Sequence, residues 1–294
     1  MEKVTSFTLE NGICGVKIEN PPRIDIFKTF DCGQCFRFDS VSLFGHKHEF
    51  GGVAFERYVV FAQDTEDELY IYNSTVEEYE NIWHGFLAFD VDYEEIDEHI
   101  STSVKSEHMD RAIECSRGIR ILRQDGWEAV CSFIISQNNN IPRIKKIISS
   151  LCKNYGGSVC FLNETYYSFP TYKALLEAGE GAIFDLKTGF RAKYIIDACQ
   201  AIDEGRVSLD IIRKTEDFNS CVEQLCRVKG IGLKVASCAL LFGFYKTEAF
   251  PIDVWMKRAL ERYFPNGIDL PLLGKRAGIA QQYLFYYEKY IQNP

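Results

Sequence analysis

The first 75 residues alternate short apolar runs with polar turns, a pattern typical of a β-sheet. β-branched and aromatic residues dominate each run, and turn-forming residues such as Asp64–Asp67 stand between the runs. The next run, Thr75–Phe86, has its apolar residues at helical spacing and predicts an amphipathic helix. The runs expected to form strands are Ile13–Ile18, Cys35–Phe38, Gly52–Phe55, Tyr58–Ala62 and Glu68–Tyr72.

From Glu107 onward, apolar residues recur every three or four positions, which predicts a helical region. Glycine, proline and asparagine mark the breaks between the helices. The charged run Asp90–His99 is interpreted as a solvated helix face or a linker. The expected helices are Glu107–Arg117, Trp127–Ser136, Ile141–Tyr155, Thr171–Ala178, Arg191–Ala201, Asp217–Cys226, Leu233–Phe244, Val254–Phe264 and Gly278–Tyr290.

These patterns predict an α+β fold in which an N-terminal antiparallel sheet with flanking helices precedes two all-α subdomains. Residues 1–100 would form the α+β domain and residues 101–225 the first helical subdomain. Residues 226–294 would carry a helix-hairpin-helix and the C-terminal helices, and would pack with residues 101–125.

The segment Cys226–Asp253 has two glycines, Gly230 and Gly232, between two helix-forming runs. Glycine accepts positive φ and lets another backbone approach closely, so a tight hairpin is expected there. Amides at the start of the second helix would bind an anion such as a phosphodiester. The segment is therefore a candidate helix-hairpin-helix DNA clamp.

Lys234 stands in the first turn of the second expected helix, where the helix dipole disfavours a positive charge and lowers the pKa of a lysine. Such a lysine can act as a nucleophile or form a Schiff base. Cys238, four residues later, would share its helix face. Asp253 follows a proline 19 positions after Lys234 and is an N-cap by its context, which does not exclude a catalytic role. A solvated surface lysine is the alternative for Lys234.

The net charge of −9 is unevenly distributed along the chain. Residues 1–100 hold 21 acidic and 7 basic residues, a net charge of −14, whereas residues 101–294 hold 21 acidic and 26 basic residues, a net charge of +5. A polyanion would therefore bind the second part, and the acidic part would face solvent.

Eleven cysteines are scattered through the chain, and the first ten residues lack the apolar core of a secretion signal. We therefore expect a cytoplasmic protein with reduced thiols, associated with the nucleoid if the source is prokaryotic. No apolar run approaches the ~18 residues of a membrane span, so no membrane partner is expected.

The residues GIGLKVA…PIDVWM resemble the helix-hairpin-helix plus Gly/Pro…Asp signature of the base-excision DNA glycosylase superfamily (HhH-GPD). In that superfamily, the lysine marks the bifunctional members. Further motifs between Cys32 and Phe285 resemble those of the 8-oxoguanine DNA glycosylase/AP lyase family. No cysteine follows Cys238, so the iron–sulfur loop of the endonuclease III and adenine glycosylase branches is missing.

The segment from Cys32 to Arg37 reads CGQCFR and admits three interpretations. The two cysteines, with His46 and His48, have loose zinc-ligand spacing, which is a weak signal. A plain β-turn glycine is the second interpretation. The stronger one is a resemblance to the family's Gly-Gln-x-Phe-Arg segment, which implies that the carbonyl of Gly33 accepts the N7 hydrogen of 8-oxoguanine, a hydrogen that guanine lacks.

Two motifs resemble the family's contacts with the opposite strand. The loop NNNIPR implies that Asn138 fills the gap left by the extruded base and that Arg143 contacts the orphaned cytosine, whereas a capped turn would explain one asparagine and not three. The segment GFRAK implies that Phe190 is a wedge beside the cytosine and that Arg191 hydrogen-bonds it. The alternative is a core phenylalanine and an arginine paired with an acid.

In the last expected helix, the resemblance implies that Phe285 stacks on one face of the flipped base and Cys238 on the other, while Gln281 binds its Watson–Crick edge. The i, i+4 spacing lets Gln281 and Phe285 meet one ligand, although aromatic residues at this spacing are more often core. The family also implies a structural monovalent or calcium ion on the hairpin carbonyls of Cys226, Val228 and Ile231. The chemistry itself needs no cofactor.

Four positions depart from the animal enzymes of the family. Ser237 replaces an acidic residue, and Trp255 replaces a histidine that contacts a 5′ phosphate. Phe190 replaces a tyrosine, and Lys229 replaces a proline and would add affinity for phosphate.

The sequence thus predicts a monomeric, bifunctional 8-oxoguanine DNA glycosylase with AP lyase activity that acts on double-stranded DNA. Lys234 would attack C1′ of the sugar, Asp253 would stabilise the transition state, and Gly230 and Gly232 would bind the DNA backbone. Two alternatives stay open: a monofunctional helix-hairpin-helix glycosylase for another damaged base, and a non-catalytic DNA-binding protein.

Overall fold

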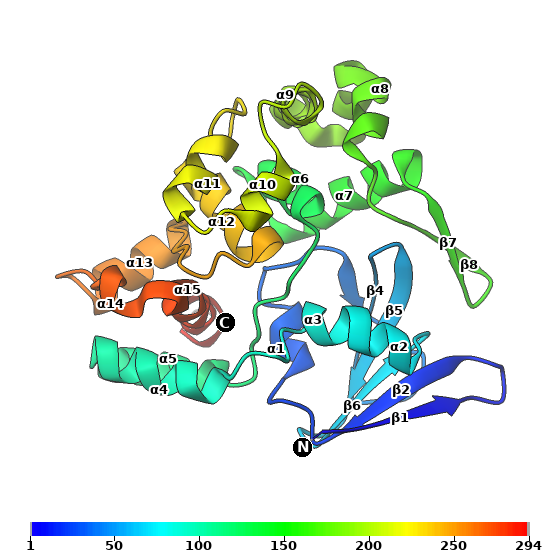
Figure 1. Cartoon of the computed structure of the whole chain (residues 1–294), viewed down its shortest axis with the longest axis horizontal. Coiled ribbons are helices and arrows are strands. Elements are labelled where there is room, and N and C mark those ends of the chain that lie inside the picture. The colour runs from blue at the N-terminus through cyan, green and yellow to red at the C-terminus, as the bar shows by residue number, and fades with distance from the viewer. Residues whose placement is uncertain (1, 293–294) are drawn as a thin grey trace.

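An antiparallel sheet of six strands forms the N-terminal end of the protein (Figure 1). The computed structural model describes residues 2–292. The strands run in the order β1-β2-β6-β5-β4-β3, so β1 and β3 are the two edge strands of the sheet. Their bounds are β1 (Lys3–Thr8), β2 (Cys14–Glu19), β3 (Phe38–Ser40), β4 (His48–Ala54), β5 (Arg57–Gln63) and β6 (Glu68–Tyr72).

The sheet is confirmed, with two differences from the expected strands. The run Cys35–Phe38 is wrong as a strand, because only Phe38 belongs to β3 and the residues before it form a turn. Strand β1 was not predicted, since most of its residues stay partly exposed at a sheet edge and carry little apolar patterning.

Helices cover one face of this sheet, and their aromatic side chains form its core. α1 (Ile26–Phe30) supplies Phe30, whose ring centroid lies 5.2 Å from that of Phe61 on β5. The predicted helix at Thr75–Phe86 is confirmed as a continuous helical segment with a π-helical middle, and Thr75 and Glu78 form its capping box. Its pieces are α2 (Val76–Glu78), η1 (Tyr79–Trp83) and α3 (His84–Phe86).

A short hairpin from the helical part packs on the other face of the sheet. It consists of β7 (Ser158–Phe161) and β8 (Glu164–Tyr167), and neither strand was expected from the sequence. The ring of Tyr58 on β5 stacks on Phe161 at 4.9 Å and on Tyr166 at 3.8 Å. This aromatic stack joins the hairpin to the N-terminal sheet.

The rest of the chain is helical, as predicted. The helix Ile141–Tyr155 and the helix Leu233–Phe244 have the expected bounds, and the other predicted helices are present within a few residues. The helices are α4 (Tyr93–Val104), α5 (Glu107–Ser116), α6 (Gly126–Ser136), α7 (Ile141–Tyr155), α8 (Tyr172–Ile183), η2 (Phe184–Thr188), η3 (Gly189–Arg191), α9 (Ala192–Asp203), α10 (Leu209–Lys214), α11 (Phe218–Leu225), α12 (Leu233–Phe244), α13 (Val254–Tyr263), α14 (Leu270–Leu273), η4 (Gly274–Arg276), α15 (Ala277–Tyr286) and η5 (Tyr287–Ile291).

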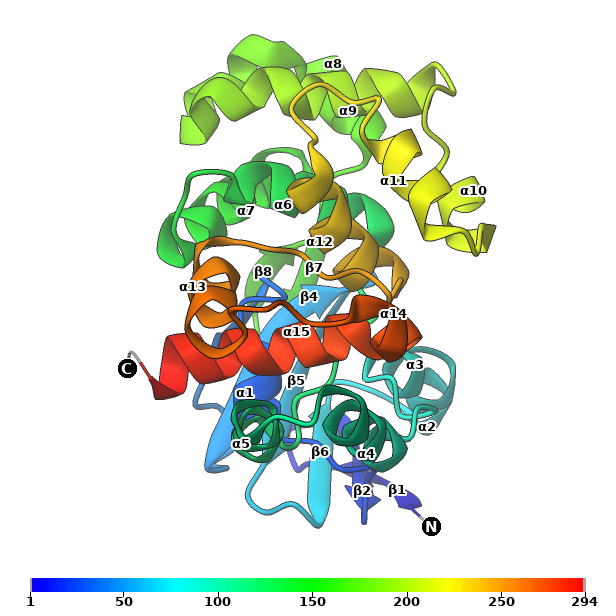
Figure 2. The same ribbon diagram turned by 90° about the vertical axis from the view of Figure 1, so that its left-hand side faces the viewer.

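α12 is the central helix, because every residue from Val235 to Phe244 is buried. It packs so closely on α6 that a Cβ atom at Gly243 would lie 2.5 Å from the Cβ of Ala129. Figure 2 shows α15 crossing between α12 and α13 on one side and α4 and α5 on the other. α12 therefore carries Lys234 and Cys238, and α15 carries Gln281 and Phe285.

The charged run Asp90–His99 is more than the solvated face that was expected. It contains the start of α4, whose Tyr93, Ile96 and Ile100 are buried. Asp97 accepts a hydrogen bond from the hydroxyl of Tyr283 on α15 at 2.8 Å and pairs with Arg23. The many acidic residues of this run obscured the apolar face of α4 in the sequence, and this face joins the N-terminal part to the C-terminal helix α15. The division of the chain at residues 100 and 225 stays a prediction.

Candidate active site

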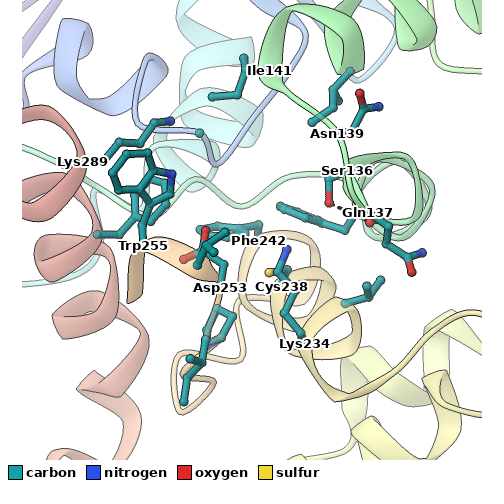
Figure 3. A pocket seen from close by; sticks show the side chains of 18 of the residues that line it. Ser136, Gln137, Asn139, Ile141, Lys234, Cys238, Phe242, Asp253, Trp255 and Lys289 are labelled. Carbon is teal, nitrogen blue, oxygen red and sulfur yellow. Dashed lines mark hydrogen bonds between the residues drawn. The ribbon is translucent and has the colours of Figure 1, made fainter. Parts of the chain in front are cut away.

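A cavity of about 1000 Å³ opens between the N-terminal sheet part and the helical part of the molecule (Figure 3). Its walls come from four distant parts of the chain: residues 32–36, 133–144, 232–257 and 281–289. The cavity brings together eight of the residues that the sequence singles out, namely Gly33, Asn138, Gly232, Lys234, Cys238, Asp253, Gln281 and Phe285. The other predicted site residues, Arg143, Phe190, Arg191, Gly230, Cys226, Val228 and Ile231, lie outside its walls.

Lys234 and Cys238 share one face of α12, as their spacing predicts. Gly232 is the N-cap of this helix, so Lys234 stands in its first turn and is half-buried. Burial raises the pKa of the Cys238 thiol to about 11, and the neighbouring Lys234 ammonium opposes that rise. The thiol is therefore protonated at neutral pH, and the amine is the nucleophile that this wall offers.

Asp253 lies on the same side of the cavity as these two side chains (Figure 3). It is the N-cap of α13, and its Oδ1 accepts a hydrogen bond from the amide of Met256 at 2.8 Å. The capping role is thus confirmed. The cap fixes the direction of the carboxylate and uses one of its two oxygens, so a cation that develops in the cavity would meet an oriented negative charge.

Gly33 lies in a turn that is held from both sides. Its φ of +80° favours glycine, whereas an added Cβ would find ordinary contacts at 3.7 Å, so the backbone conformation sets the requirement. The buried amide of Gln34 donates to the carbonyls of Thr29 and Arg120, each at 2.8 Å, and accepts from the amide of Leu122 at 2.8 Å. The turn is consequently fixed in place at the cavity wall.

The zinc interpretation of this turn is wrong. Cys32 and Cys35 are buried, and their thiols donate to the carbonyls of Thr29 and Phe30. His46 is bound by Asp64 at 2.8 Å and by the hydroxyl of Tyr72 at 2.6 Å. Among residues 2–292, no three histidine, cysteine or acidic side chains come together as metal ligands.

Gln281 and Phe285 project from α15 into the cavity. Gln281 is only 4% exposed, and its Oε1 has no hydrogen-bond partner within residues 2–292. A buried polar atom without a partner costs free energy, which a ligand that donates a hydrogen bond would recover. The neighbouring Gln282 differs, because its amide donates to the carbonyl of Cys32 at 3.1 Å.

Each of the three asparagines at 138–140 has its own place. Asn140 caps α7 by accepting from the amide of Arg143, and Asn139 donates to the carbonyl of Ile135, each at 3.0 Å. Asn138 is exposed at the cavity wall with a φ of +47°, a conformation that asparagine tolerates better than most residues. A capped turn therefore accounts for Asn139 and Asn140 but leaves Asn138 for another role.

Phe190 and Arg191 differ sharply in exposure. Phe190 is 47% exposed, so it is not the core residue of the alternative interpretation. Arg191 is 2% exposed and pairs with no acid in the part of the chain that the structure describes; it donates to the carbonyls of Gln137 at 2.9 Å and Asn138 at 2.8 Å. In this structure Arg191 supports the asparagine loop from within. Arg143 is exposed, and its guanidinium lies 3.5 Å from the carbonyl oxygen of Lys187.

The hairpin between α11 and α12 is anchored on α9. Gly230 has a φ of +83°, and the amide of Lys229 donates to the carboxylate of Asp197 at 2.6 Å. Within the described residues, the hairpin carbonyls of Cys226 and Ile231 accept no hydrogen bond, and that of Val228 accepts one from the amide of Ile231 at 3.1 Å. These carbonyls are thus compatible with the cation that the family resemblance implies.

Lys289 and Trp255 are among the cavity residues that the sequence did not assign to the base pocket. Lys289 lies on η5 and lines the cavity beyond Phe285, and Trp255 lines it from α13. The repeat of four positions from Gln281 to Phe285 to Lys289 is the signal that could have identified the lysine.

No helix within residues 2–292 is long and apolar enough to cross a membrane.

Two family models together match most of the chain. Residues 17–130 match the N-terminal domain of 8-oxoguanine DNA glycosylase. Residues 131–269 match the HhH-GPD superfamily of base excision DNA repair proteins. The boundary between the two matches falls inside α6, whose residues line the cavity at its C-terminal end.

Relatives agree with these matches. A probable N-glycosylase/DNA lyase of Methanothermobacter thermautotrophicus is 31% identical over 229 residues, which cover 68% of this chain and 70% of that protein. The N-glycosylase/DNA lyase of Saccharomyces cerevisiae is 36% identical over 157 residues, which cover 50% of this chain but only 42% of the yeast protein.

A solved structure matches the whole fold. The Clostridium acetobutylicum 8-oxoguanine glycosylase/lyase, in complex with double-stranded DNA containing cytosine opposite 8-oxoguanine, has a TM-score of 0.88 and 33% identity. The match covers 99% of this chain and 98% of that one. With an N-terminal sheet domain, a helix-hairpin-helix and a lysine–aspartate cavity between them, this chain belongs to the 8-oxoguanine DNA glycosylase/lyase family of the HhH-GPD superfamily.

Proposed function

We propose that this protein excises 8-oxoguanine from double-stranded DNA and then cleaves the resulting abasic site. The single observation that carries the proposal is the cavity, which gathers the amine of Lys234, the carboxylate of Asp253 and the partnerless oxygen of Gln281 around one space. About 1000 Å³ is at the upper end of the range for small-molecule sites, so a whole nucleotide fits. Bases that react inside duplex DNA must first be extruded into such a pocket.

The base would be recognised by neutral groups. The Gly33 carbonyl would accept the N7 hydrogen of 8-oxoguanine, and guanine would present only a second acceptor there. The Gln281 oxygen would accept from the Watson–Crick edge, where guanine derivatives carry N–H donors. Phe285 and Cys238 would hold the two faces of the ring, and the neutral thiol is suited to contact with an aromatic face.

The chemistry would begin with attack by the Lys234 amine on C1′ of the sugar. A bond forms between Nζ and C1′, and the glycosidic bond breaks, so the base leaves with the bonding electron pair and takes up a proton. The Asp253 carboxylate stabilises the positive charge that develops on the sugar. Loss of a proton from the amine and opening of the sugar give a Schiff base, and loss of a C2′ proton then expels the 3′ phosphate by β-elimination.

The surrounding residues would hold the distorted duplex. Asn138 would fill the gap left by the base, exposed Phe190 would wedge beside the opposite cytosine, and Arg143 would contact that cytosine. The amides near Gly230 and Gly232 would bind the backbone, with a cation on the hairpin carbonyls as a structural element. We further expect a monomer in the cytoplasm.

The test is borohydride trapping on a duplex that carries 8-oxoguanine opposite cytosine. Borohydride reduces a Schiff base to a stable covalent bond, so the parent protein should form an adduct and Lys234→Gln should form none. Lys153→Gln is the matched control, because Lys153 is an exposed lysine on α7 outside the cavity. An undamaged duplex should give no adduct with any of them.

The other outcomes identify the alternatives. An adduct that persists in Lys234→Gln would assign the Schiff base to another amine. Base release without an adduct would indicate a monofunctional glycosylase, and lesion binding without base release would indicate a DNA-binding protein.

A further inference from the structure

Lys289 is a charged residue of the cavity to which the proposed reaction gives no role. It lies on η5, the π-helical continuation of α15, four residues after Phe285 and eight after Gln281. Gln281 is buried, whereas Phe285 and Lys289 are partly exposed. These three side chains therefore form a row from the floor of the cavity to its rim.

The Lys289 ammonium is held by aromatic groups. Its nitrogen lies 4.6 Å from the ring centroid of Tyr290 and 5.2 Å from that of Phe285, and it donates to the Tyr290 hydroxyl at 3.0 Å. Within residues 2–292 it makes no salt bridge at 4.0 Å or less. An ammonium group has three donors, and one hydrogen bond leaves two for a ligand.

The surroundings of Lys289 favour an anion. Burial lowers its pKa, and the more distant carboxylates of Asp253 and Asp31 oppose this without reversing it. A partly desolvated cation is stabilised most by a negative group placed directly against it. The cavity wall otherwise carries Lys234, Lys257 and Asp253, so lysines outnumber carboxylates there by three to one. Lys257 is 70% exposed and pairs with Glu261, and the proposed reaction uses Lys234 on the sugar, which leaves Lys289 as the half-buried lysine of the wall without a role.

We propose that Lys289 binds a backbone phosphate that flanks the nucleotide extruded into the cavity. This inference rests on the proposed function, because it requires a nucleotide that enters base first. The base then occupies the floor near Gln281, the sugar meets Lys234, and the flanking phosphates stay at the rim. A lysine binds phosphate as a compact point charge. Trp255, on the same side of the cavity in Figure 3, carries no charge and could offer a phosphate only its indole N–H.

The experiment is a cycle between a protein variant and a modified DNA. The parent protein, Lys289→Met and Lys289→Arg are titrated with an 8-oxoguanine duplex whose 5′ or 3′ flanking phosphate is replaced, one at a time, by an uncharged methylphosphonate. Loss of a charged hydrogen bond should weaken binding of Lys289→Met to the natural duplex roughly tenfold. At one of the two positions, the methylphosphonate should weaken binding by the parent protein but leave Lys289→Met unaffected.

Two further readouts separate a phosphate contact from a structural role. The slope of log K against log salt should become shallower by about 0.9 in Lys289→Met, as expected when one phosphate contact is lost. Lys289→Arg should restore both the slope and the sensitivity to methylphosphonate, because it keeps the charge. The thermal midpoint of Lys289→Met should stay close to that of the parent protein, since methionine keeps an unbranched apolar side chain against the rings of Phe285 and Tyr290.

Three results would overturn the inference. Equal sensitivity of the parent protein and Lys289→Met to both methylphosphonates would show that no flanking phosphate meets this lysine. Loss of discrimination between 8-oxoguanine and guanine, with an unchanged salt slope, would place Lys289 on the base. If the parent protein neither distinguishes nor excises 8-oxoguanine, the proposed function fails as well, whereas normal excision with no coupling refutes the inference about Lys289 alone.

Discussion

The aromatic ring of Tyr194 on α9 lies against Gly230 of the hairpin, so closely that a Cβ atom at position 230 would stand 2.4 Å from ring carbons. The same ring meets Phe190 edge-on at 5.9 Å between centroids. One tyrosine thus touches both the hairpin expected to bind the DNA backbone and the residue expected to wedge into the duplex. The distance between Gly230 and Phe190 is therefore set by their packing on the Tyr194 ring and not by the length of chain between them.

Gly230→Ala should therefore destabilise the protein by about 2 kcal/mol or more. The new methyl group meets the Tyr194 ring, and the φ of +83° costs a non-glycine residue roughly 1 kcal/mol by itself. Gly232→Ala is the control, because nothing lies within 4 Å of its added Cβ and its φ is −98°. Gly232→Ala should lower the free energy of unfolding by at most about 1 kcal/mol, because it changes only the N-cap of α12. Denaturant unfolding of both variants measures the difference, and equal losses would contradict the packing argument.

Asp253→Asn should separate the two roles of this residue. Asparagine caps helices as well as aspartate does, so the free energy of unfolding should change little. Base excision should fall by roughly 10²-fold or more, because the negative charge beside the reacting sugar is lost. Asp253→Ala should lose activity to a similar extent and also about 1 kcal/mol of stability. Single-turnover excision and thermal melting test this, and full activity of the asparagine variant would leave Asp253 as a cap only.

Gln281→Met and Gln282→Met should have opposite effects on stability. Among the described residues, 2–292, the buried Gln281 oxygen has no partner, so its removal should leave the protein as stable as before or more stable by up to about 1 kcal/mol. The Gln282 amide satisfies the carbonyl of Cys32, and its loss should cost about 1–3 kcal/mol. Excision of 8-oxoguanine should drop in Gln281→Met despite its stability. A destabilised Gln281→Met would indicate that this oxygen has a partner in solution.

Arg191→Met should destabilise the protein, whereas Arg143→Met should not. Removal of Arg191 leaves the partly buried carbonyl of Gln137 and the buried carbonyl of Thr188 without their donor, at a cost of about 1–3 kcal/mol. Arg143 is exposed, and its loss should change stability by less than about 0.5 kcal/mol. Arg143→Met should instead reduce the preference for cytosine opposite the lesion. Melting curves and excision rates opposite the four bases provide the measurements; equal excision opposite all four bases by the parent protein would refute the preference.

The buried carboxyl of Glu128 should make stability depend on pH. Burial raises the pKa of Glu128 to about 7, against the opposing effect of Arg37, whose guanidinium lies 3.4 Å away. The folded chain then holds this proton more tightly than the unfolded chain, so the contribution is present below pH 4.5 and is lost as the pH rises through 7. The loss would amount to at most roughly 3 kcal/mol.

Glu128→Gln should flatten this dependence between pH 5 and pH 8, because glutamine does not titrate. Glu223→Gln, at an exposed glutamate, should leave the profile unchanged. Unfolding free energies measured across this pH range test both variants. Identical profiles for the parent protein and Glu128→Gln would show that the carboxyl is ionised throughout.

Local sequence determined the elements whose signals lie within one or two turns of the chain. α7 has the predicted bounds because Asn140 caps it and Pro142 suits its first turn, and α12 has them because Gly232 begins an apolar run that ends at the left-handed Tyr245. The pairing of Lys234 with Cys238 followed from the helical repeat. The sequence motifs likewise identified the site residues from Gly33 to Phe285, although not their positions in space.

Tertiary structure decided what depends on residues far apart in sequence. β1 and the β7–β8 hairpin carry weak local patterns, and they are strands because neighbouring strands and the Tyr58 ring complete them. Arg191 was expected to hydrogen-bond the cytosine or to pair with an acid, yet three carbonyls from two segments hold it inside the protein. Lys289 shares the helical repeat of Gln281 and Phe285, but this repeat lines the cavity because α15 and η5 pack beside α13. Helix and turn positions follow from residue type and spacing over a few residues. Burial, and the groups that surround a charged side chain, instead follow from packing between segments that are far apart in the sequence.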